Sequence, residues 1–319
     1  MASHTQVERI AIVGTGTIGA SWAAHYLAHG FDVVATDPGP GAEEALRRYV
    51  DDAWDTVGAL GLEPGASRER LSFTTDLHAA VANADFVQEQ APERLELKVK
   101  LFADIDNAAP VDAIIASSSS GIPMSDIQTG CKHPERTVIG HPFNPPHVIP
   151  LVEVVGGRAT GAETVEAAMA FYAAVGKRPI RLHKELPGHV ANRLQSALYR
   201  EVVYLIDQGV LDVAAADDAV SWGPGLRWGV MGPSLLWHLG GGAGGIQHFM
   251  DTLMDPMAAT WKALGNPQMT PELKQTIVDG VLAEADGRSI DELSAERDAM
   301  LLGLQAVRSE NEPAHPAAA

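Results

Sequence analysis

The chain has 319 residues, and at roughly 150 residues per domain this length predicts about two domains. Hydrophobic residues make up 46% of the sequence and charged residues 20%, a composition typical of an ordinary folded protein. With 23 Lys plus Arg against 41 Asp plus Glu, the formal net charge is −18. This balance argues against sequence-independent nucleic-acid binding, which needs a basic surface, and weakly against an anionic membrane surface.

The single cysteine and the absence of long apolar runs limit the class of protein further. Cys131 excludes an internal disulfide and a cysteine-based zinc cluster. No apolar run approaches the roughly 18–20 residues that cross a membrane, and the N-terminus lacks the pattern of a signal peptide. We therefore expect a cytoplasmic protein. His25 and His29 have metal-ligand spacing, but no acid completes a zinc motif, so no metal site is expected.

The first 40 residues predict a strand, a glycine-rich turn, a helix and a second strand. Residues 9–13 are apolar nearly throughout, as a buried parallel strand requires. A helix is expected over 20–29 and a strand over 31–36, which Asp37 follows. Between the first strand and the helix lies the motif Gly14-Thr15-Gly16-Thr17-Ile18-Gly19.

Each glycine of this motif has a physical role in dinucleotide binding. Gly14 permits a tight turn, Gly16 lets the backbone approach a pyrophosphate at the positive end of the helix, and Gly19 permits close packing. Asp37 lies 18 residues beyond the last glycine, near the spacing of the carboxylate that binds ribose hydroxyls. A carboxylate there repels a 2′-phosphate, which favours NAD over NADP. The alternative is a tight turn in an α/β protein that binds no nucleotide.

Strand and helix patterns continue to alternate up to residue 187. This alternation predicts an α/β fold, a Rossmann-type doubly wound sheet followed by a smaller all-helical domain. Expected strands lie at 84–87, 113–116, 138–140 and 151–155, and expected helices at 43–60, 95–105 and 162–175.

The pattern changes near Pro187, after which strand-like runs disappear. We expect an NAD-binding domain over 1–187, a helical substrate and dimerisation domain over 188–308, and a disordered tail over 309–319. The expected helices of the second domain lie at 190–208, 212–220, 271–282 and 290–307.

Two polar segments follow expected strands, where ligands bind in open α/β sheets. The first is the serine run 117–120, which predicts hydrogen bonds to a substrate or a nicotinamide, although a helix N-cap or a flexible loop explains it equally well. The second is Gly140-His141-Pro142-Phe143-Asn144-Pro145-Pro146, in which prolines fix the backbone around His141 and Asn144. His141 is a candidate proton carrier, and a packed histidine bonded to backbone is the alternative.

Two further polar residues lie where a lone polar group is unfavourable. Glu153 lies inside the apolar run 149–155, which is costly unless the acid is paired, and orienting a histidine would supply the reason. An edge strand with Glu153 facing water is the alternative. Asn192 lies in the first turns of the long helix that opens the second domain, where asparagine needs a partner.

These segments, in this order, resemble the 3-hydroxyacyl-CoA dehydrogenase superfamily over residues 7 to 308, and the block from Ala116 to Gly156 is specific to that superfamily. Within it, the chain is most similar to the short-chain hydroxy-acid branch. That branch includes L-carnitine 3-dehydrogenase and L-gulonate 3-dehydrogenase, the lambda-crystallin type.

The resemblance implies a catalytic role for His141, oriented by Glu153. It places the substrate-binding serine on Ser120, with Ser119 as the alternative. It assigns the two asparagines of the site to Asn144, on the cofactor side, and Asn192. It also assigns Glu93 and Lys98 to the nicotinamide side; the sequence pattern alone indicates only a charged helix start there.

The implied reaction is NAD-dependent oxidation of the 3-hydroxyl of a small hydroxy acid. His141 takes the hydroxyl proton while hydride passes to NAD, and Ser120 and Asn192 bind the reacting oxygen. An L-carnitine dehydrogenase-like enzyme is the first expectation, with L-gulonate 3-dehydrogenase or a 3-hydroxyacyl-CoA dehydrogenase as alternatives. A non-catalytic NAD-binding sensor or structural protein is the alternative of another class.

Most of the candidate substrate-recognition residues lie in the second domain. The segments 222–228 and 240–245 resemble the corresponding segments of bacterial carnitine dehydrogenases. Arg227 is a candidate ligand for a carboxylate. Four aromatic residues are candidates for a quaternary-ammonium cage, with domain-interface packing as the alternative for most of them: Phe143, Trp222, Trp228 and Trp237. The resemblance also implies a homodimer formed through the helical domain.

Overall fold

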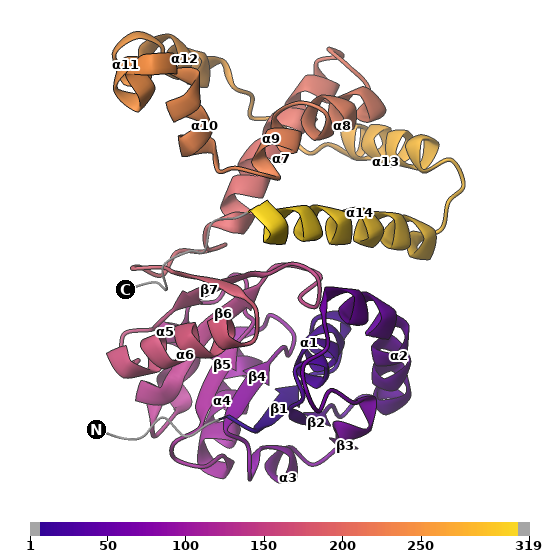
Figure 1. Cartoon of the computed structure of the whole chain (residues 1–319), viewed down its shortest axis with the longest axis vertical. Coiled ribbons are helices and arrows are strands. Elements are labelled where there is room, and N and C mark those ends of the chain that lie inside the picture. The colour runs from indigo at the N-terminus through magenta and orange to yellow at the C-terminus, as the bar shows by residue number, and fades with distance from the viewer. Residues whose placement is uncertain (1–6, 312–319) are drawn as a thin grey trace. The chain divides into compact units, whose positions relative to one another are not determined.

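The structure is a computed structural model that describes residues 7–311. The chain divides into two compact units, unit 1 up to Arg193 and unit 2 from Leu194 onward (Figure 1). This division lies in the first turn of helix α7 (Ala191–Asp207), a few residues after the expected boundary at Pro187.

Unit 1 is built on one sheet whose strands, within the described residues, lie in the order β3-β2-β1-β4-β5-β6-β7-β8. All neighbouring strands are parallel except β6 and β7. The strands are β1 (Arg9–Val13), β2 (Asp32–Thr36), β3 (Leu71–Thr74), β4 (Phe86–Glu89), β5 (Ile114–Ser117), β6 (Thr137–Pro142), β7 (Leu151–Val155) and β8 (Arg178–Arg181).

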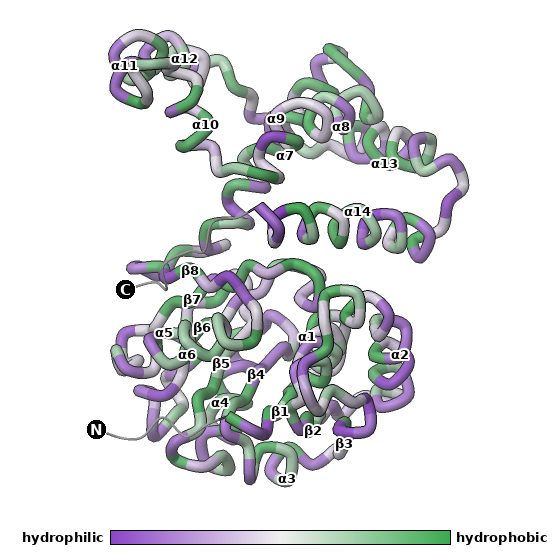
Figure 2. The backbone as a smooth tube through the Cα atoms, in the orientation of Figure 1, coloured by the Kyte–Doolittle hydropathy of each residue, from purple (hydrophilic) through white to green (hydrophobic). Residues whose placement is uncertain are grey.

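Helices cover both faces of this sheet because its central strands are apolar on both sides. Ile10 and Ile12 of β1 pack into one cluster with Trp22 and Tyr26 of α1. The alternate residue Ala11 packs into a second cluster on the other face. Figure 2 shows the central strands mostly in the hydrophobic colour. The helices are α1 (Thr17–Ala28), α2 (Ala42–Leu60), α3 (Leu77–Val81), α4 (Leu95–Ala108), α5 (Met124–Ile127) and α6 (Ala162–Ala174).

The carboxyl ends of the central strands meet at one edge of the sheet. Val13 at the end of β1 is paired with Glu89 of β4, and Glu89 is paired with Ser117 of β5. From β1 the chain runs outward through β2 and β3 on one side and continues with β4 on the other. This reversal is the topological switch point at which open α/β sheets bind their ligands.

Unit 2 is helical and has little core of its own. Its main buried cluster consists of Ile206, Val213 and Ala216, and α14 has no buried residue. In Figure 2, α13 and α14 alternate between hydrophobic and hydrophilic colours along their length. After α7, the helices are α8 (Val213–Ser221), α9 (Pro224–Trp228), α10 (Pro233–Gly240), α11 (Gly245–Thr252), α12 (Met254–Thr260), α13 (Pro271–Ala285) and α14 (Ile290–Asn311).

The expected fold class, a Rossmann-type sheet followed by a helical part, is confirmed, and several details differ from the expectation. β3 and β8 were not expected from the sequence, nor were the short helices α9 to α12. α14 continues to Asn311, so the first residues of the expected tail are helical, and residues 312–319 lie outside the described residues. No helix in the described part of the chain is long and apolar enough to span a membrane.

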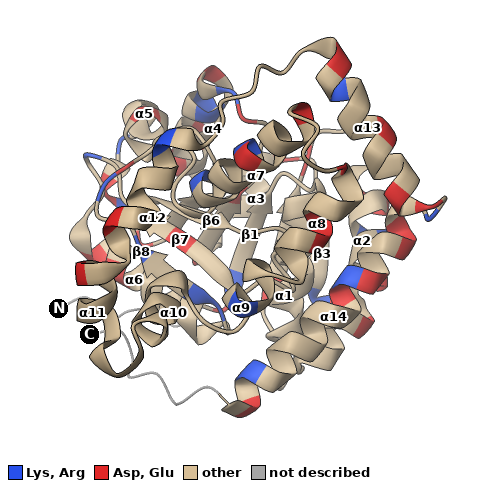
Figure 3. Cartoon of the chain, turned by 90° about the horizontal axis from the view of Figure 1, so that it is seen from above, with Lys and Arg blue, Asp and Glu red and all other residues tan. Residues whose placement is uncertain are grey.

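The acidic net charge does not mark one surface. Figure 3 shows acidic segments scattered over α2, α8, α13 and α14, with basic segments among them. Such a mixed surface is typical of solvation rather than of a charged partner.

Candidate active site

The glycine-rich loop between β1 and α1 is tight at both ends and open in the middle. Gly14 has a φ of 92°, which favours glycine, and its N–H donates to the Thr36 carbonyl at 2.9 Å. A Cβ on Gly19 would lie 2.0 Å from the Gly14 carbonyl oxygen, so no side chain fits there. Among the described residues, nothing lies within 4 Å of a Cβ built on Gly16. The loop therefore leaves room for a pyrophosphate beside Gly16.

The start of α1 and the end of β2 complete a dinucleotide site. No side chain caps α1, and its first turn, which includes Thr17 and Ile18, contains no acid, so its N–H groups are available to an anion. Asp37 Oδ2 accepts the Thr15 N–H at 2.9 Å and Oδ1 accepts the Gly39 N–H at 2.8 Å. These bonds hold the carboxylate beside the glycine loop, where it suits ribose hydroxyls. The residues present thus fit NAD.

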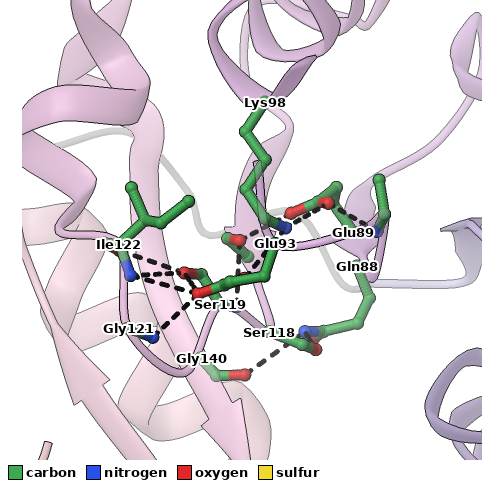
Figure 4. A network of polar contacts seen from close by, with 11 residues as sticks. Gln88, Glu89, Glu93, Lys98, Ser118, Ser119, Gly121, Ile122 and Gly140 are labelled. Carbon is green, nitrogen blue, oxygen red and sulfur yellow. Dashed lines mark hydrogen bonds and ion pairs between the residues drawn. The ribbon is translucent and has the colours of Figure 1, made fainter. Parts of the chain in front are cut away.

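A buried ion pair lies at the ends of β4 and β5 (Figure 4). Lys98, which is 1% exposed, reaches Glu89 Oε1 at 2.7 Å and lies 3.8 Å from Glu93 Oε2. Ser117 donates to the other oxygen of Glu89 at 2.5 Å. Because each buried charge has a partner, the network is tolerated in the interior, and removing one partner would leave an unpaired charge.

Glu93 organises the serine loop that follows β5 (Figure 4). Its Oε1 accepts the Ser119 hydroxyl at 2.6 Å and the N–H groups of Gly121 and Ile122 at 2.8 and 3.1 Å. Burial by itself raises the pKa of Glu93, but these hydrogen bonds and Lys98 outweigh it, and the pKa lies below its usual value. Glu93 is therefore a carboxylate at neutral pH, and it restrains the loop that carries Ser120.

Gln88 of β4 links the neighbouring strands β5 and β6 through hydrogen bonds. Its Nε2 donates to the Ser118 hydroxyl at 2.9 Å and to the Gly140 carbonyl at 3.3 Å, as Figure 4 shows. Its Oε1 accepts the hydroxyl proton of Tyr172 at 2.6 Å. These bonds fix the ends of β4 and β5 relative to β6, which carries His141.

His141 and Glu153 form a hydrogen-bonded pair across β6 and β7. The two residues are direct partners in the antiparallel register, and His141 Nδ1 lies 2.9 Å from Glu153 Oε2. Glu153 Oε1 accepts the N–H groups of Val190 and Ala191 at 2.8 and 3.0 Å, at the start of α7. Glu153 is fully buried and His141 is 7% exposed. The acid in the apolar run is thus satisfied inside the protein and does not face water.

The charge of Glu153 fixes the tautomer of His141. Burial alone raises the pKa of Glu153, but hydrogen bonds from His141, Ala191 and Val190 outweigh it and lower the pKa below its usual value. An ionised carboxylate only accepts, so Nδ1 of His141 carries the proton that it donates. The other ring nitrogen, Nε2, then has a free lone pair, which is what a general base needs.

The remaining expected residues of unit 1 differ in how deeply they are buried. Ser119 is buried and its hydroxyl is bonded to Glu93, whereas Ser120 is only half-buried. Phe143 is half-buried and Asn144 exposed in the segment after β6, and Asn192 is half-buried in the first turn of α7.

The expected substrate residues of the helical part belong to unit 2. Arg227 and Trp228 are exposed on α9, and Trp222 is exposed just before it. Trp237 stacks on Phe249 with ring centroids 4.9 Å apart, so it contributes to packing within unit 2.

Several residues at the site were missed by the reasoning from sequence. Glu89 ends the β4 run, and the argument that a buried acid needs a partner applies to it as it does to Glu153. Gln90 follows β4 at the switch point, and its amide atoms are buried without a hydrogen bond in the described structure. Lys177 donates to the carbonyls of Pro146 and Ile149. No local signal in the sequence marks Lys177.

Comparison with known proteins places this chain in one family. The chain matches the family models "3-hydroxyacyl-CoA dehydrogenase, NAD binding domain" over residues 9–186 and "3-hydroxyacyl-CoA dehydrogenase, C-terminal domain" over residues 188–280. It therefore belongs to the 3-hydroxyacyl-CoA dehydrogenase family, and its cofactor is NAD. The resemblance inferred from the sequence and the expected cofactor are both confirmed.

Individual relatives are similar over nearly the whole chain. An L-carnitine dehydrogenase of Streptomyces coelicolor is 50% identical over 298 residues, 93% of this chain and 94% of the relative. An L-carnitine dehydrogenase of Pseudomonas aeruginosa is 45% identical, over 99% of this chain and 98% of the relative.

Solved structures support the same grouping. The crystal structure of an NAD-dependent 5-formyl-3-hydroxy-2-methylpyridine 4-carboxylic acid 5-dehydrogenase superposes with a TM-score of 0.82 at 32% identity, covering 96% of this chain and 100% of that one. A 3-hydroxybutyryl-CoA dehydrogenase of Escherichia coli superposes with a TM-score of 0.61 at 34% identity, covering 73% of this chain and 49% of that one.

Proposed function

We propose that this protein oxidises the 3-hydroxyl group of L-carnitine to the 3-oxo group with NAD. The observation that carries the chemistry is the His141–Glu153 pair, in which a buried carboxylate holds Nδ1 and leaves Nε2 as a base. The choice of L-carnitine among 3-hydroxy acids is supported by relatives named L-carnitine dehydrogenase at 45–50% identity over most of the chain.

His141 takes the proton of the substrate hydroxyl at Nε2, and Glu153 stabilises the imidazolium that results. NAD, when bound, accepts the hydride that leaves C3. In the reverse direction, His141 returns the proton to the oxygen. Glu153 can support this cycle because its second oxygen accepts the N–H groups of Val190 and Ala191.

Ser120 and Asn192 bind the reacting oxygen in this proposal. Ser120 is preferred over Ser119 because the Ser119 hydroxyl is already bonded to Glu93 at 2.6 Å. Glu93, Lys98 and Asn144 act on the nicotinamide side. The contacts of Glu93 with the serine loop support a role in positioning that loop.

The ends of a carnitine molecule suggest two further contacts. Arg227 is the candidate ligand for the carboxylate, and Phe143 and Trp228 are each a candidate, within its own unit, for cation–π contact with a trimethylammonium group. The exposure of Arg227 and Trp228 on α9 is compatible with ligand contact.

A homodimer through unit 2 belongs to the same proposal. Trp222, Ile290 and Met300 are 75%, 77% and 76% exposed, and many other large apolar side chains of unit 2 are exposed as well. Surfaces of this kind are typical of protein interfaces. A cytoplasmic location fits an enzyme that uses the cellular NAD pool, and fractionation of the source cells tests it.

The function is tested by NADH formation with a panel of four substrates: L-carnitine, L-gulonate, 3-hydroxybutyrate and its CoA ester. The proposal expects the highest kcat/KM with L-carnitine. A higher kcat/KM with another compound of the panel would identify that compound as the better substrate and contradict the choice of L-carnitine. Tight NADH binding without turnover of any member would contradict the enzymatic proposal and favour an NAD sensor.

A further inference from the structure

A second imidazole, that of His189, lies beside the proposed base. The ring centroids of His189 and His141 are 4.9 Å apart and the rings are tilted by 40°. His189 Nε2 lies 2.9 Å from the backbone carbonyl oxygen of Ser119, and the residue is 3% exposed. His189 therefore contacts both the serine loop and the base, and the function proposed above gives it no role.

The hydrogen bond to Ser119 fixes the tautomer of His189. A carbonyl oxygen only accepts, so Nε2 carries the proton. The other nitrogen, Nδ1, is buried and has no hydrogen-bond partner in the described structure. The neutral rings of His141 and His189 are thus opposite tautomers, one protonated on Nδ1 and the other on Nε2.

This position is unfavourable for a residue with a purely structural role. His189 has a φ of 47°, in the left-handed region that side chains rarely adopt. Its buried Nδ1 adds the cost of a polar atom without a partner, which an apolar aromatic ring would avoid. Backbone strain and buried polar atoms without a partner are both concentrated at functional sites.

We propose that His189 is a positioning residue for catalysis: its Nε2–H bond to the Ser119 carbonyl and its contact with the His141 ring hold the serine loop and the base at a fixed distance. This inference rests on the proposed function of His141. His189 touches neither the hydride path nor the transferred proton. It acts through Ser119, whose neighbour Ser120 binds the reacting oxygen, and through the ring of His141.

The charge state of His189 follows from its surroundings. Burial is the largest influence and lowers its pKa, and His141 lowers it further. The bond to Ser119 and the carboxylates Glu153 and Glu93 raise it, but the net pKa lies below the usual value. A proton added to Nδ1 would find no acceptor in the described structure.

Two substitutions test separately the hydrogen bond that His189 donates to Ser119 and the contact that the His189 ring makes with His141. His189→Gln keeps an N–H donor near the position of Nε2 and removes the titrating ring. His189→Phe keeps an aromatic ring and removes the donor. His183→Gln, an exposed histidine of the same connecting segment, is the matched control. The measurements are kcat, KM, the pH profile of kcat/KM, and the NADH dissociation constant by fluorescence.

The proposal expects His189→Phe to lower kcat at least about tenfold, because misplaced reacting groups are costly, with NADH binding unchanged. His189→Gln should recover most of kcat. Its acid limb should differ from that of the wild type, because the His189 ring, whose pKa is lowered mainly by burial, is absent. Wild-type kcat and pH profile in His189→Phe would overturn the proposal, and so would an unchanged acid limb in His189→Gln. If His189→Phe does not fold, the acid limb of the kcat/KM pH profile of His189→Gln tests the proposal.

Failure of this inference can be distinguished from failure of the proposed function. The kinetics use whichever 3-hydroxy acid the wild type oxidises, so a substrate other than L-carnitine does not affect the comparison. If no substrate is oxidised, histidine NMR titration of the NADH complex replaces kinetics. A His141 titration that is unchanged in His189→Gln overturns the inference, and a shifted titration supports it.

Discussion

The two units of this protein differ in how completely they bury their apolar side chains. In unit 1, strands with two apolar faces lie between helices, and large residues such as Trp22, Tyr26 and Phe102 are fully buried. In unit 2, α10, α12 and α14 have no buried residue, and side chains as large as Trp222 are exposed.

This difference indicates which part of the molecule depends on further association. Unit 1 can be stable on its own core, and the proposed base and its partners lie within it. Unit 2 presents more apolar surface than a monomeric helical domain usually tolerates. We therefore expect changes in unit 1 to affect chemistry and cofactor binding, and changes on the surface of unit 2 to affect assembly.

The largest expected effect is that of His141→Ala. Removal of the base should lower kcat by about 10²–10⁴-fold, the usual contribution of general acid–base catalysis. The NADH dissociation constant and the oligomeric state should not change, because the glycine loop and unit 2 are untouched. Steady-state kinetics, NADH fluorescence and light scattering check this. Turnover at the wild-type rate would refute the assignment of the base.

The second prediction compares substitutions at two glycines of the loop, Gly19 and Gly16, whose surroundings differ. Gly19→Ala places a Cβ 2.0 Å from the Gly14 carbonyl oxygen, so it should weaken NADH binding and also lower the free energy of unfolding by about 1–3 kcal/mol. Gly16→Ala meets open space and should weaken NADH binding with little loss of stability. Urea unfolding and fluorescence titration separate the two. Equal stability of the two variants would contradict this interpretation.

A third prediction concerns the exposed face of α14. Charged substitutions at Ile290 and Met300, which are 77% and 76% exposed, should convert the proposed dimer to monomers at micromolar concentration. The combined Ile290→Glu and Met300→Glu variant is measured by sedimentation equilibrium. Val111→Glu, at a 66% exposed apolar residue of unit 1, is the control and should leave the mass unchanged. A wild-type protein that sediments as a monomer would remove the dimer proposal.

The last prediction concerns a pH dependence of stability from Lys177. Burial lowers its pKa from 10.5 to about 7, so between these values the unfolded chain binds a proton that the folded chain does not. Stability therefore rises with pH in this window, by at most ~1.4 kcal/mol per pH unit. Below the window the lysine is protonated in both states and adds no slope.

Lys177→Met should remove this contribution to the slope, as measured by urea unfolding at several pH values across the window. Lys262→Met, at an exposed lysine of unit 2, is the control and should keep the wild-type slope. If the slope of stability against pH persists in Lys177→Met, titrating groups other than Lys177 cause it.

The parts of the fold that depend on local pattern could be predicted from the sequence. The glycine motif with its strands and helix is contiguous, and the apolar runs of β1, β5 and β7 are visible in the chain. β8 was missed because its residues Arg178–Arg181 are mostly exposed and lack an apolar run. The short helices α9 to α12 were missed because glycine and proline interrupt the helical pattern there.

The site could be predicted only in part, because its contacts join distant segments. His141 and Glu153 were identified as candidates, but no periodicity reveals that β6 and β7 are antiparallel and register these two residues as partners. His189 bonds to a residue 70 positions away, so its burial has no local signal. Glu93 likewise bonds to a serine loop 26 to 29 positions away, whereas the sequence pattern indicated only a charged helix start.

The antiparallel pairing of β6 and β7 also bears on how such an enzyme can diversify. His141 and Glu153 are paired directly across the two strands. Residues 143–150 form the loop that joins these strands. Substitutions in that loop change its side chains but leave the backbone pairing of His141 with Glu153 in place. In the proposed function, the groups that transfer the proton are thus held by strand pairing, and this pairing does not depend on which side chains the loop carries.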